Sequence, residues 1–514
     1  MTFDAMKKDL TVAVVGTGTM GRGIMQVSAQ GGMRVIAFDQ EAGAAAKARE
    51  AIAKTLRGLV EKGRISDSES RAAVERISVA DQFKEVKQAD IVIEAVVEIL
   101  DVKQALFQRL DELCGPETIL ASNTSSLSVT AIAARCGKPE RVGGMHYFNP
   151  VPLMKLVEII PGLKTAQWVT DAMMGIGRRQ GREPVLCIDS PGFIVNHAGR
   201  GVREVERVLI EGIAQPHEID RIMTGAPGLK LGPFALFDMV GLDISHGVHV
   251  SFFEQYFGEP AYQPSPIGTL RIAGGMLGAK TGRGWYHHAD GKRIEPALTE
   301  APKVALPTAV WIAPEPGCAD LQEPVRQLCV EAGVALEGGE RPSEGALILV
   351  TPLGEDVTTV ATKRGFDAGR TVGLDTLFGM KGPRTLMVSP STRAQVREAA
   401  HALLAYDGQP VVVINDSPGF VAQRTIAMIV NIGCQIAQRG IAQSKDIDKA
   451  VKLGLGYPYG PLEWGDRIGP GRVLTILERL QTFYGEPRYR PSPWLKRRVA
   501  LGLPLTAPDR MTAV

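Results

Sequence analysis

A short glycine-rich segment near the N-terminus constrains the fold more than any other feature of this 514-residue chain. An apolar run rich in β-branched residues, Leu10–Val15, leads into Gly16-Thr-Gly-Thr-Met-Gly21, and a helical pattern continues to about Gln30. A second β-like run, Arg34–Phe38, then ends at Asp39. This order of strand, glycine turn, helix and strand predicts a βαβ unit whose turn approaches a bound dinucleotide.

The glycines of this turn have separate tasks. Gly16 allows the sharp turn, Gly18 lets the backbone approach a pyrophosphate, and Gly21 lets the helix pack closely on the strand. The pyrophosphate then lies at the helix N-terminus, where backbone N–H groups point outward. Asp39 follows Gly21 by 18 residues, where a carboxylate binds a ribose diol and repels a 2′-phosphate. The sequence therefore favours NAD over NADP. It also favours a dinucleotide-binding turn over the alternative of a purely structural glycine turn.

Further β-like runs alternate with helical stretches such as Asp101–Leu113. These runs are Ile91–Glu94, Ile119–Ala121, Val142–His146 and Leu156–Ile160. Alternation of this kind predicts an α/β Rossmann domain with a doubly wound, mostly parallel sheet. Binding residues are expected at the carboxyl ends of its strands. The polar residues found there are Glu94, Ser122, Asn123 and His146.

From about residue 190 helical periodicity replaces the alternation, and the helical segment is then repeated. Asp189-Ser-Pro-Gly-Phe193 recurs as Asp416-Ser-Pro-Gly-Phe420, and Gly232-Pro233 recurs as Gly460-Pro461. The offsets are 227 and 228 residues, which predicts a duplicated all-α domain. Residues 300–410 hold β-like runs without a GxGxxG turn, as expected of a degenerate α/β segment. The expected domains are 8–189, 190–290, 300–411 and 412–503.

Composition excludes several classes of partner. Lys and Arg number 58 against 56 Asp and Glu, a formal charge of +2, so neither a nucleic acid nor a membrane surface is expected to bind. The six cysteines are widely spaced, which predicts reduced thiols in the cytoplasm and no zinc site. Asp243, His246 and His249 share a helix face, but without a clear further ligand we expect no metal. His287 and His288 are expected to be a simple tail after a glycine turn.

Five motifs in order carry a family resemblance. They are the Gly16–Gly21 turn, Glu94-Ala-Val-Val-Glu98, Ser122-Asn-Thr-Ser-Ser126, His146-Tyr-Phe-Asn-Pro150 and Asp189-Ser-Pro-Gly-Phe-Ile-Val-Asn196. With them the chain resembles the 3-hydroxyacyl-CoA dehydrogenase family over about residues 8–287, and again from about 410 to 503. The layout resembles the long form associated with phenylacetate degradation and 3-hydroxybutyryl-CoA oxidation.

A base is needed to oxidise an alcohol by hydride transfer, and imidazole titrates close to working pH. His146 is the predicted base, and Glu158, twelve residues on past the Asn149-Pro150 turn, can return beside it to fix its tautomer. Alone, a histidine at a strand end such as His146 is more often structural. The alternative for Glu158 is a sheet-edge carboxylate, which its apolar neighbours disfavour. The resemblance implies that Ser125 and Asn196 complete the catalytic set by holding the reacting oxygen. A helix N-cap is the alternative for Ser125, and a polar helix start for Asn196.

The resemblance also implies a cofactor set and a coenzyme A set. The NAD-binding residues are Gly16, Gly18, Met20, Gly21, Asp39, Glu98, Lys103, Asn149 and Lys280, and the coenzyme A contacts are Thr55 and Lys62. In the second half, Asp375 stands in place of His146, Gln423 in place of Asn196, and Gly354 roughly in place of Ser125. Without the base, the donors and the cofactor turn, the second half is expected to be inactive.

The predicted activity is NAD-dependent oxidation of (S)-3-hydroxyacyl-CoA to 3-oxoacyl-CoA, with 3-hydroxybutyryl-CoA or 3-hydroxyadipyl-CoA as substrate, in fatty-acid or phenylacetate degradation. One alternative is a β-hydroxyacid dehydrogenase of another substrate class, but no lysine lies between Phe193 and Ala214 to serve as its base. Another is a non-catalytic NAD-binding structural protein. Family members are usually dimers, so the two helical domains are expected to pair as an internal pseudo-dimer. A homodimer of the whole chain stays open.

Overall fold

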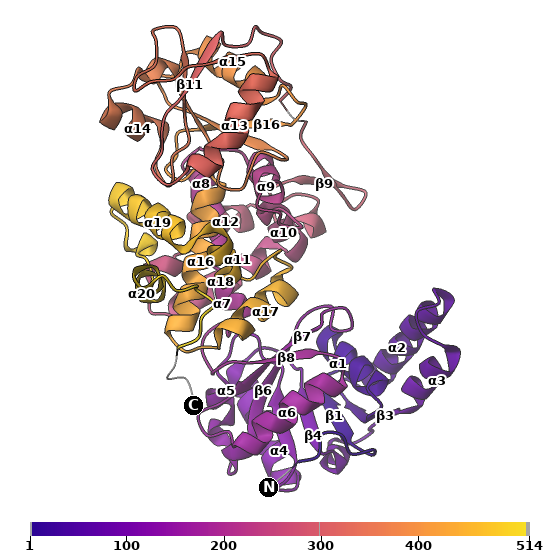
Figure 1. Ribbon diagram of the computed structural model, residues 1–514. Coiled ribbons are helices and arrows are strands. Elements are labelled where there is room, and N and C mark those ends of the chain that lie inside the picture. Colours follow the sequence, from indigo (N-terminus) through magenta and orange to yellow (C-terminus); the bar gives the residue numbers. More distant parts are fainter. Residues whose placement is uncertain (1–2, 298, 510–514) are drawn as a thin grey trace. The chain divides into compact units, whose positions relative to one another are not determined.

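The computed structural model describes residues 3–297 and 299–509, which divide into two compact units. The first unit comprises residues 3–197 and 439–455, and the second comprises residues 198–438 and 456–509. Figure 1 follows the chain through both units. The first unit thus contains a segment from late in the sequence.

The first unit is built on an eight-stranded sheet in the order β3-β2-β1-β4-β5-β6-β7-β8. Its strands are β1 (Thr11–Val15), β2 (Arg34–Phe38), β3 (Ile77–Val79), β4 (Ile91–Glu94), β5 (Ile119–Ser122), β6 (Val142–Tyr147), β7 (Leu156–Pro161) and β8 (Glu183–Leu186). Neighbouring strands are parallel except for β6 and β7, which run antiparallel. The sheet is therefore the doubly wound, mostly parallel type that the sequence predicts, and its strand order reverses at β1.

Helices cover both faces of this sheet (Figure 1). The helices of the first unit are α1 (Thr19–Gln30), α2 (Ala44–Glu61), α3 (Asp67–Glu75), α4 (Leu100–Leu113), α5 (Val129–Ile132), α6 (Gln167–Arg179), α7 (Val195–Ala198, at the unit boundary) and α17 (Ser444–Leu455). One core layer contains Ile24 of α1, Ile52 of α2 and Met173 of α6. The other contains Phe107 of α4 and Ile132 of α5. The result is a three-layer α/β/α arrangement.

The second unit combines helices with a second sheet. Its helices are α8 (Glu204–Ile210), α9 (Pro216–Thr224), α10 (Pro233–Val240), α11 (Leu242–Gln255), α12 (Pro266–Ala273), α13 (Ala319–Glu331), α14 (Val357–Arg364), α15 (Ala394–Leu404), α16 (Ala422–Gln438), α18 (Pro461–Ile468), α19 (Pro470–Tyr484) and α20 (Pro493–Leu501). The sheet has the order β12-β11-β13-β14-β15-β16. Its strands are β11 (Ala309–Ile312), β12 (Ala335–Leu336), β13 (Leu347–Val350), β14 (Thr371–Leu374), β15 (Arg384–Val388) and β16 (Val411–Asn415).

The second sheet repeats the plan of the first in reduced form. The pair β14–β15 is antiparallel, like β6–β7 in the first sheet. The pair β15–β16 is parallel, like β7–β8. No GxGxxG turn occurs between β11 and α13. The predicted fold class is confirmed: an α/β Rossmann sheet, helices, a degenerate α/β sheet and helices again.

The repeat extends to backbone conformation. Phe193 and Phe420 hold equivalent places and both have positive φ, 48° and 51°. This conformation is uncommon for residues other than glycine. Asp189 accepts hydrogen bonds from the N-terminus of α5, and Asp416 accepts them in the same way from the N-terminus of α14. The two copies therefore share the turn as well as its sequence.

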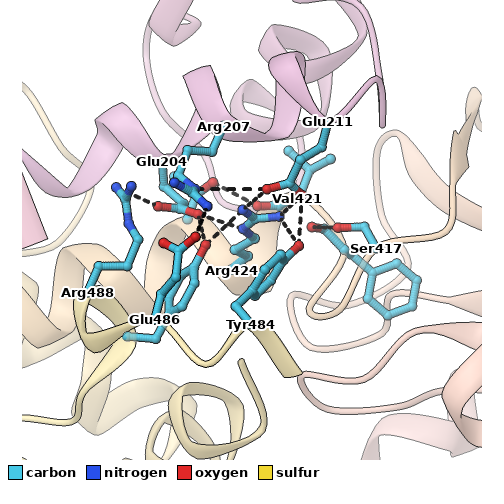
Figure 2. Close-up of polar contacts among 12 residues, drawn as sticks. Glu204, Arg207, Glu211, Ser417, Val421, Arg424, Tyr484, Glu486 and Arg488 are labelled. Atoms are coloured by element: carbon cyan, nitrogen blue, oxygen red, sulfur yellow. Dashed lines mark hydrogen bonds and ion pairs between the residues drawn. The ribbon is translucent and has the colours of Figure 1, made fainter. Parts of the chain in front are cut away.

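A buried ionic cluster lies within the second unit (Figure 2). Arg424 of α16 donates through Nε to Glu204 at 2.6 Å and through Nη1 and Nη2 to Glu211 at 2.7 and 2.9 Å. Its remaining N–H groups donate to the hydroxyls of Tyr484 and Tyr489, each at 2.8 Å. All five guanidinium donors are thereby used.

Three further charges complete this Arg424 cluster. Arg488 lies 3.1 Å from Glu204, and Arg207 pairs with Glu486 at 2.5 Å. Three arginines thus face three glutamates. Arg424 and Glu204 are almost fully buried, so each relies on the other for compensation of its charge. Because Glu204 begins α8 and Arg424 lies on α16, the cluster joins the first helical repeat to the second.

Several elements depart from the sequence-based expectation. β3, β8, β12, β14 and β15 were not among the predicted strands. The expectation that His287 and His288 form a tail is wrong, because His287–Ala289 (β9) pairs with Lys292–Ile294 (β10) in a hairpin. His288 Nε2 lies 3.0 Å from the buried carboxylate of Asp238, which ties the hairpin to α10.

Candidate active site

His146 and Glu158 face each other across the antiparallel strands β6 and β7. Their side chains meet, with Nδ1 of the imidazole 2.6 Å from Oε2 of the carboxylate. Both side chains are buried. The strand, turn and returning strand expected after residue 146 thus place the carboxylate beside the imidazole. A carboxylate at Nδ1 keeps the proton there and leaves Nε2 to act as the base.

The second oxygen of Glu158 is also engaged. Oε1 accepts hydrogen bonds from the backbone N–H groups of Ile194 and Val195, at 3.0 and 2.9 Å. The positive-φ turn at Phe193 directs these N–H groups inward. Sequence reasoning did not assign this task to the Asp189–Phe193 motif, although the turn residues themselves signal an unusual backbone.

Ser125 lies in a loop after β5 that Glu98 holds. Oε1 of Glu98 accepts hydrogen bonds from the backbone N–H groups of Ser125 and Ser126, at 2.8 and 3.0 Å, and from Thr124 Oγ1 at 2.6 Å. Asn196 Nδ2 donates to the carbonyl oxygen of Ser125 at 3.3 Å. The structure therefore brings Ser125, Asn196 and Glu98 together. The helix-cap alternative for Ser125 is wrong, because Ser128 caps α5.

Lys103 connects Glu98 to the fully buried carboxylate of Glu94. Its Nζ lies 2.6 Å from Glu94 Oε1 and 3.1 Å from Glu98 Oε2. Glu94 Oε2 also accepts a hydrogen bond from Ser122 Oγ at 2.7 Å. Burial opposes ionisation of Glu98, yet the Lys103 ammonium and the loop donors bring its pKa below the usual value. Glu98 is therefore a stable anion beside the Ser125 loop.

The glycine turn between β1 and α1 fits a dinucleotide. Gly16 has φ +92°, and a Cβ there would lie 2.6 Å from the carbonyl oxygen of Ala95. A Cβ on Gly21 would lie 1.8 Å from the carbonyl oxygen of Gly16. Beside Gly18, the N-cap of α1, an added Cβ would meet nothing within 4 Å. Two glycines thus allow the close packing, and the third leaves open space at the helix N-terminus for a phosphate.

Asp39 directly follows β2, next to this turn. Its Oδ2 accepts hydrogen bonds from Thr17 N and Thr17 Oγ1, at 2.6 and 2.9 Å, and Oδ1 accepts one from Glu41 N at 3.0 Å. Partial burial opposes ionisation, but these donors lower its pKa below the usual value. A carboxylate fixed in this position suits a ribose diol and disfavours a 2′-phosphate. Thr17 was missed from sequence, although it lies inside the glycine turn.

The remaining predicted residues lie in four places. Met20 is in the first turn of α1 and Asn149 is in the exposed loop after β6. Thr55 is on the exposed side of α2, and Lys62 directly follows that helix. Lys280 belongs to the second unit. There it pairs with Asp243 at 2.6 Å.

His246 and His249 of α11 are buried among protein groups. His246 Nε2 lies 2.9 Å from Thr269 Oγ1, and burial lowers the pKa of both His246 and His249. Asp243 is paired with Lys280. Within residues 3–297 and 299–509, no group of three or more His, Cys, Asp or Glu side chains could hold a metal ion.

The corresponding place in the second half has different chemistry. The Asp375 carboxylate accepts hydrogen bonds from Gln423 Nε2, at 3.0 Å, and from the backbone N–H of Leu377. Its backbone N–H donates to Thr385, which holds the place of Glu158 in the strand pairing. Burial raises the pKa of Asp375 to about 6. No imidazole base is present at this position.

Helix α19 further closes the second site. A Cβ on Gly354, the position that corresponds to Ser125, would lie 2.7 Å from Ile476 Cα of that helix. Arg479 of α19 donates to the carbonyl oxygen of Leu353 at 2.7 Å and pairs with Glu315 at 3.1 Å. The carboxyl ends of β11 and β13, where a cofactor would lie, are therefore covered by protein.

Comparison with known proteins agrees with this geometry. The family model described as 3-hydroxyacyl-CoA dehydrogenase, NAD binding domain, matches residues 11–190. The model described as 3-hydroxyacyl-CoA dehydrogenase, C-terminal domain, matches residues 192–288 and again 419–508. The second match supports duplication of the helical segment.

Individual relatives differ in how much of the chain they match. The Escherichia coli (strain K12) protein named 3-hydroxyadipyl-CoA dehydrogenase is 36% identical, over 96% of this chain and 98% of that protein. A Bacillus subtilis (strain 168) protein, named probable 3-hydroxybutyryl-CoA dehydrogenase, is 38% identical over 54% of this chain and 97% of its own length. A crystal structure of 3-hydroxybutyryl-CoA dehydrogenase from Escherichia coli K12 has a TM-score of 0.85 at 35% identity, covering 96% of this chain and 99% of that one.

Proposed function

The chain belongs to the 3-hydroxyacyl-CoA dehydrogenase family, and from this premise we propose how its residues carry out the reaction. It is an NAD-dependent enzyme that oxidises the 3-hydroxyl group of an acyl-CoA thioester to a ketone. The buried His146–Glu158 pair, on the same sheet as the glycine turn, is the observation that carries the assignment of residues.

His146 removes the proton of the 3-hydroxyl group through Nε2. Glu158 holds the proton on Nδ1 and, as the imidazole becomes an imidazolium, its charge stabilises the product. Its other oxygen is held by two backbone N–H groups, so the carboxylate does not have to reorient during the reaction. Bound NAD supplies the acceptor for the hydride that leaves C3.

Ser125 and Asn196 hold the substrate oxygen. A hydroxyl and a carboxamide can both donate to this oxygen as it becomes a carbonyl, which favours the transition state. Glu98, through its bonds to the backbone at Ser125 and Ser126, fixes the loop from which the hydroxyl projects. Glu98 and Lys103 thus act mainly by placing Ser125, in addition to the cofactor contact that the family implies.

The cofactor is held mainly by the backbone. The N–H groups at the start of α1 receive the pyrophosphate beside Gly18, with Met20 in the same turn, and Asp39 receives the ribose hydroxyls. Asn149 is assigned to the nicotinamide side, Lys280 to the cofactor, and Thr55 and Lys62 to coenzyme A. These four assignments rest on the family motif.

We take a short-chain substrate, 3-hydroxybutyryl-CoA or 3-hydroxyadipyl-CoA, as the physiological one. Relatives that match this chain carry these two names. A role in fatty-acid or phenylacetate degradation follows from the same substrates. The test is turnover of the purified chain on each (S)-3-hydroxyacyl-CoA with NAD and with NADP. Reduction of NAD with either substrate supports the proposal, and its absence with both contradicts it.

The assembly and location of the protein are also proposals. We assign four domains, 8–189, 190–290, 300–411 and 412–503, with the two helical domains paired as an internal pseudo-dimer through the Arg424 cluster. Association of whole chains as a homodimer through another surface stays open. The six cysteines all carry free thiols, which supports a cytoplasmic location. No helix among the described residues is long and apolar enough to cross a membrane.

A further inference from the structure

The first unit contains a segment from the second half of the chain. Residues 439–455, which include α17, belong with residues 3–197 rather than with the helical repeat that surrounds them in sequence. The first sheet therefore does not depend only on the first half of the sequence.

The segment lies along the β8 edge of the first sheet. The backbone N–H of Ile188, just after β8, donates to the carbonyl oxygen of Ile441 at 2.9 Å. Lys449 Nζ lies 3.6 Å from Glu183 at the start of β8. Asp446 of α17 is close enough to the buried Cys187 that it helps to raise the pKa of that thiol, after burial and together with Glu158 and Asp189. Helix α17 is therefore a neighbour of β8 and of β7, the strand that carries Glu158.

The C-terminal turn of α17 packs against residues next to the active site. An added Cβ on Gly454 would lie 2.8 Å from Val195 Cγ2, 3.0 Å from Val195 Cγ1 and 3.1 Å from Leu156 Cδ2. Val195 is the residue whose backbone N–H holds Glu158, and Asn196 follows it directly. Helix α17 thus packs against the turn that positions the side chains of Glu158 and Asn196.

Glycine is a costly choice at this position. Gly454 lies inside a helix, where alanine is the better helix former, and its φ is not in the positive range that would require glycine. The reason for glycine is therefore space, because an added methyl group would press on the Val195 side chain.

In the second unit, the edge of the second sheet likewise contacts a segment from the first helical repeat. Asn415 of β16, at the edge of the second sheet, donates from its backbone N–H to the carbonyl oxygen of Ile213 at 3.0 Å. These residues correspond to Ile188 and Ile441 by the repeat offset. His217, Glu218 and Arg221 of α9 line a small cavity against Val411 and its neighbours on β16. Each sheet edge thus receives a helix from the opposite repeat.

We propose that the second half of the chain completes the catalytic unit of the first, with α17 supporting the Ile194–Asn196 turn and Gly454 acting as a positioning residue for Glu158 and Asn196. This inference rests on the proposed function of that site. The inactive half is then retained because the active half needs its helix, in addition to any role in assembly.

Three full-length variants test this proposal: Gly454→Ala, Val195→Ala and the double variant. Gly471→Ala is the control, because Gly471 also lies in a helix of the second half, in the first turn of α19, with no positive φ and nothing within 4 Å of an added Cβ. For each protein kcat, the KM values for NAD and for (S)-3-hydroxybutyryl-CoA, and the thermal midpoint are measured.

The expected result is a loss of kcat in Gly454→Ala by about 10-fold, because displacement of positioned groups by a fraction of an ångström to 1 Å has effects of this order. The KM for NAD is unchanged, and Gly471→Ala behaves as the parent. In the Val195→Ala background the two shortest contacts of the new methyl group are removed and only the one with Leu156 Cδ2 remains, so adding Gly454→Ala lowers kcat by less than about 2-fold.

Two results would overturn the proposal. One is a kcat of Gly454→Ala equal to that of Gly471→Ala. The other is a loss that persists in full in the Val195→Ala background. If Gly454→Ala does not fold, the double variant decides, because a folded double variant as active as Val195→Ala supports the proposal and an unfolded one contradicts it. The parent enzyme's turnover reports separately on the proposed function.

Discussion

Glu158 and His146 are cross-strand partners whose side chains meet at 2.6 Å in the interior of the first unit. Strand pairing sets the distance between their backbones, and two backbone N–H groups from the Phe193 turn hold the far side of the carboxylate. The base is thus oriented by the sheet itself. This explains why twelve residues, a turn and a returning strand are enough to build it.

Glu158→Gln tests the electrostatic part of this pair. The amide keeps the size of the side chain but cannot stabilise an imidazolium, so kcat is expected to fall about 100-fold or more. The KM for NAD is expected to change little, since the glycine turn is not affected. Steady-state kinetics at saturating NAD measure both values. A kcat within 2-fold of the parent would show that the charge of Glu158 is not needed.

Ser125→Ala tests the hydroxyl that holds the substrate oxygen. The backbone of this loop is bound to Glu98 independently of the hydroxyl, so the loop should keep its shape. Loss of one donor to a developing oxyanion costs about 100-fold in kcat. Ser126→Ala, in the same loop, is the matched control and should lose far less. Equal losses in the two variants would contradict the assignment.

Arg424→Met tests the buried cluster of Figure 2. Removing the guanidinium leaves the buried Glu204 and the half-buried Glu211 without their main partner, which costs about 3–5 kcal/mol of unfolding free energy. Arg497→Met, at an exposed position of α20, is the control and should be near neutral. Urea unfolding measures both. Equal stability of the two variants would show that the cluster does not stabilise the pairing.

The same cluster predicts how the stability of the parent protein depends on pH. Burial opposes ionisation of Glu204, but the arginines and Tyr489 lower its pKa below the usual 4.5 in the folded protein. A carboxyl group with a lowered folded pKa stabilises the fold above its unfolded pKa and loses that contribution as pH falls through the folded value. The difference in stability between parent and Arg424→Met should therefore shrink below about pH 4.5.

Asp375→Asn tests the inactive half, where the pKa of the buried carboxyl is raised rather than lowered on folding. Burial raises the pKa of Asp375 to about 6 in the folded protein, so folding favours its protonated form. Its contribution to stability is therefore lost as pH rises from about 4 to about 6. The amide variant should be more stable than the parent at pH 8, by about 2–3 kcal/mol, and similar to it at pH 4. Its kcat should equal that of the parent, and a large loss of kcat would contradict an inactive second half.

Much of the first half could be predicted because its signals are local. The glycine turn, the acidic residue at Asp39 and the position of Glu158 after the Asn149-Pro150 turn all depend on neighbours in sequence. Long β-branched runs such as Arg34–Phe38 became strands with the same bounds. β3 and β12 were missed because each has at most three residues, too few for a recognisable alternation.

The features that were missed depend on contacts distant in sequence. Arg424 carries no sign in its own neighbourhood that Glu204, 220 residues earlier, will compensate its charge. The repeat predicted two similar helical segments, but it could not show that α17 would join the first unit. His288 likewise became part of a hairpin because Asp238 offers it a buried carboxylate.

The most direct test of His146 as the catalytic base is the activity of His146→Gln with (S)-3-hydroxybutyryl-CoA and NAD, together with its affinity for NAD by calorimetry. Glutamine can still donate to Glu158, so the fold and the cofactor turn should be kept. We expect unchanged NAD affinity with one site per chain, and a kcat reduced about 1,000-fold or more, since the base is lost. A variant that binds NAD normally and turns over at a rate near that of the parent would contradict this role of His146.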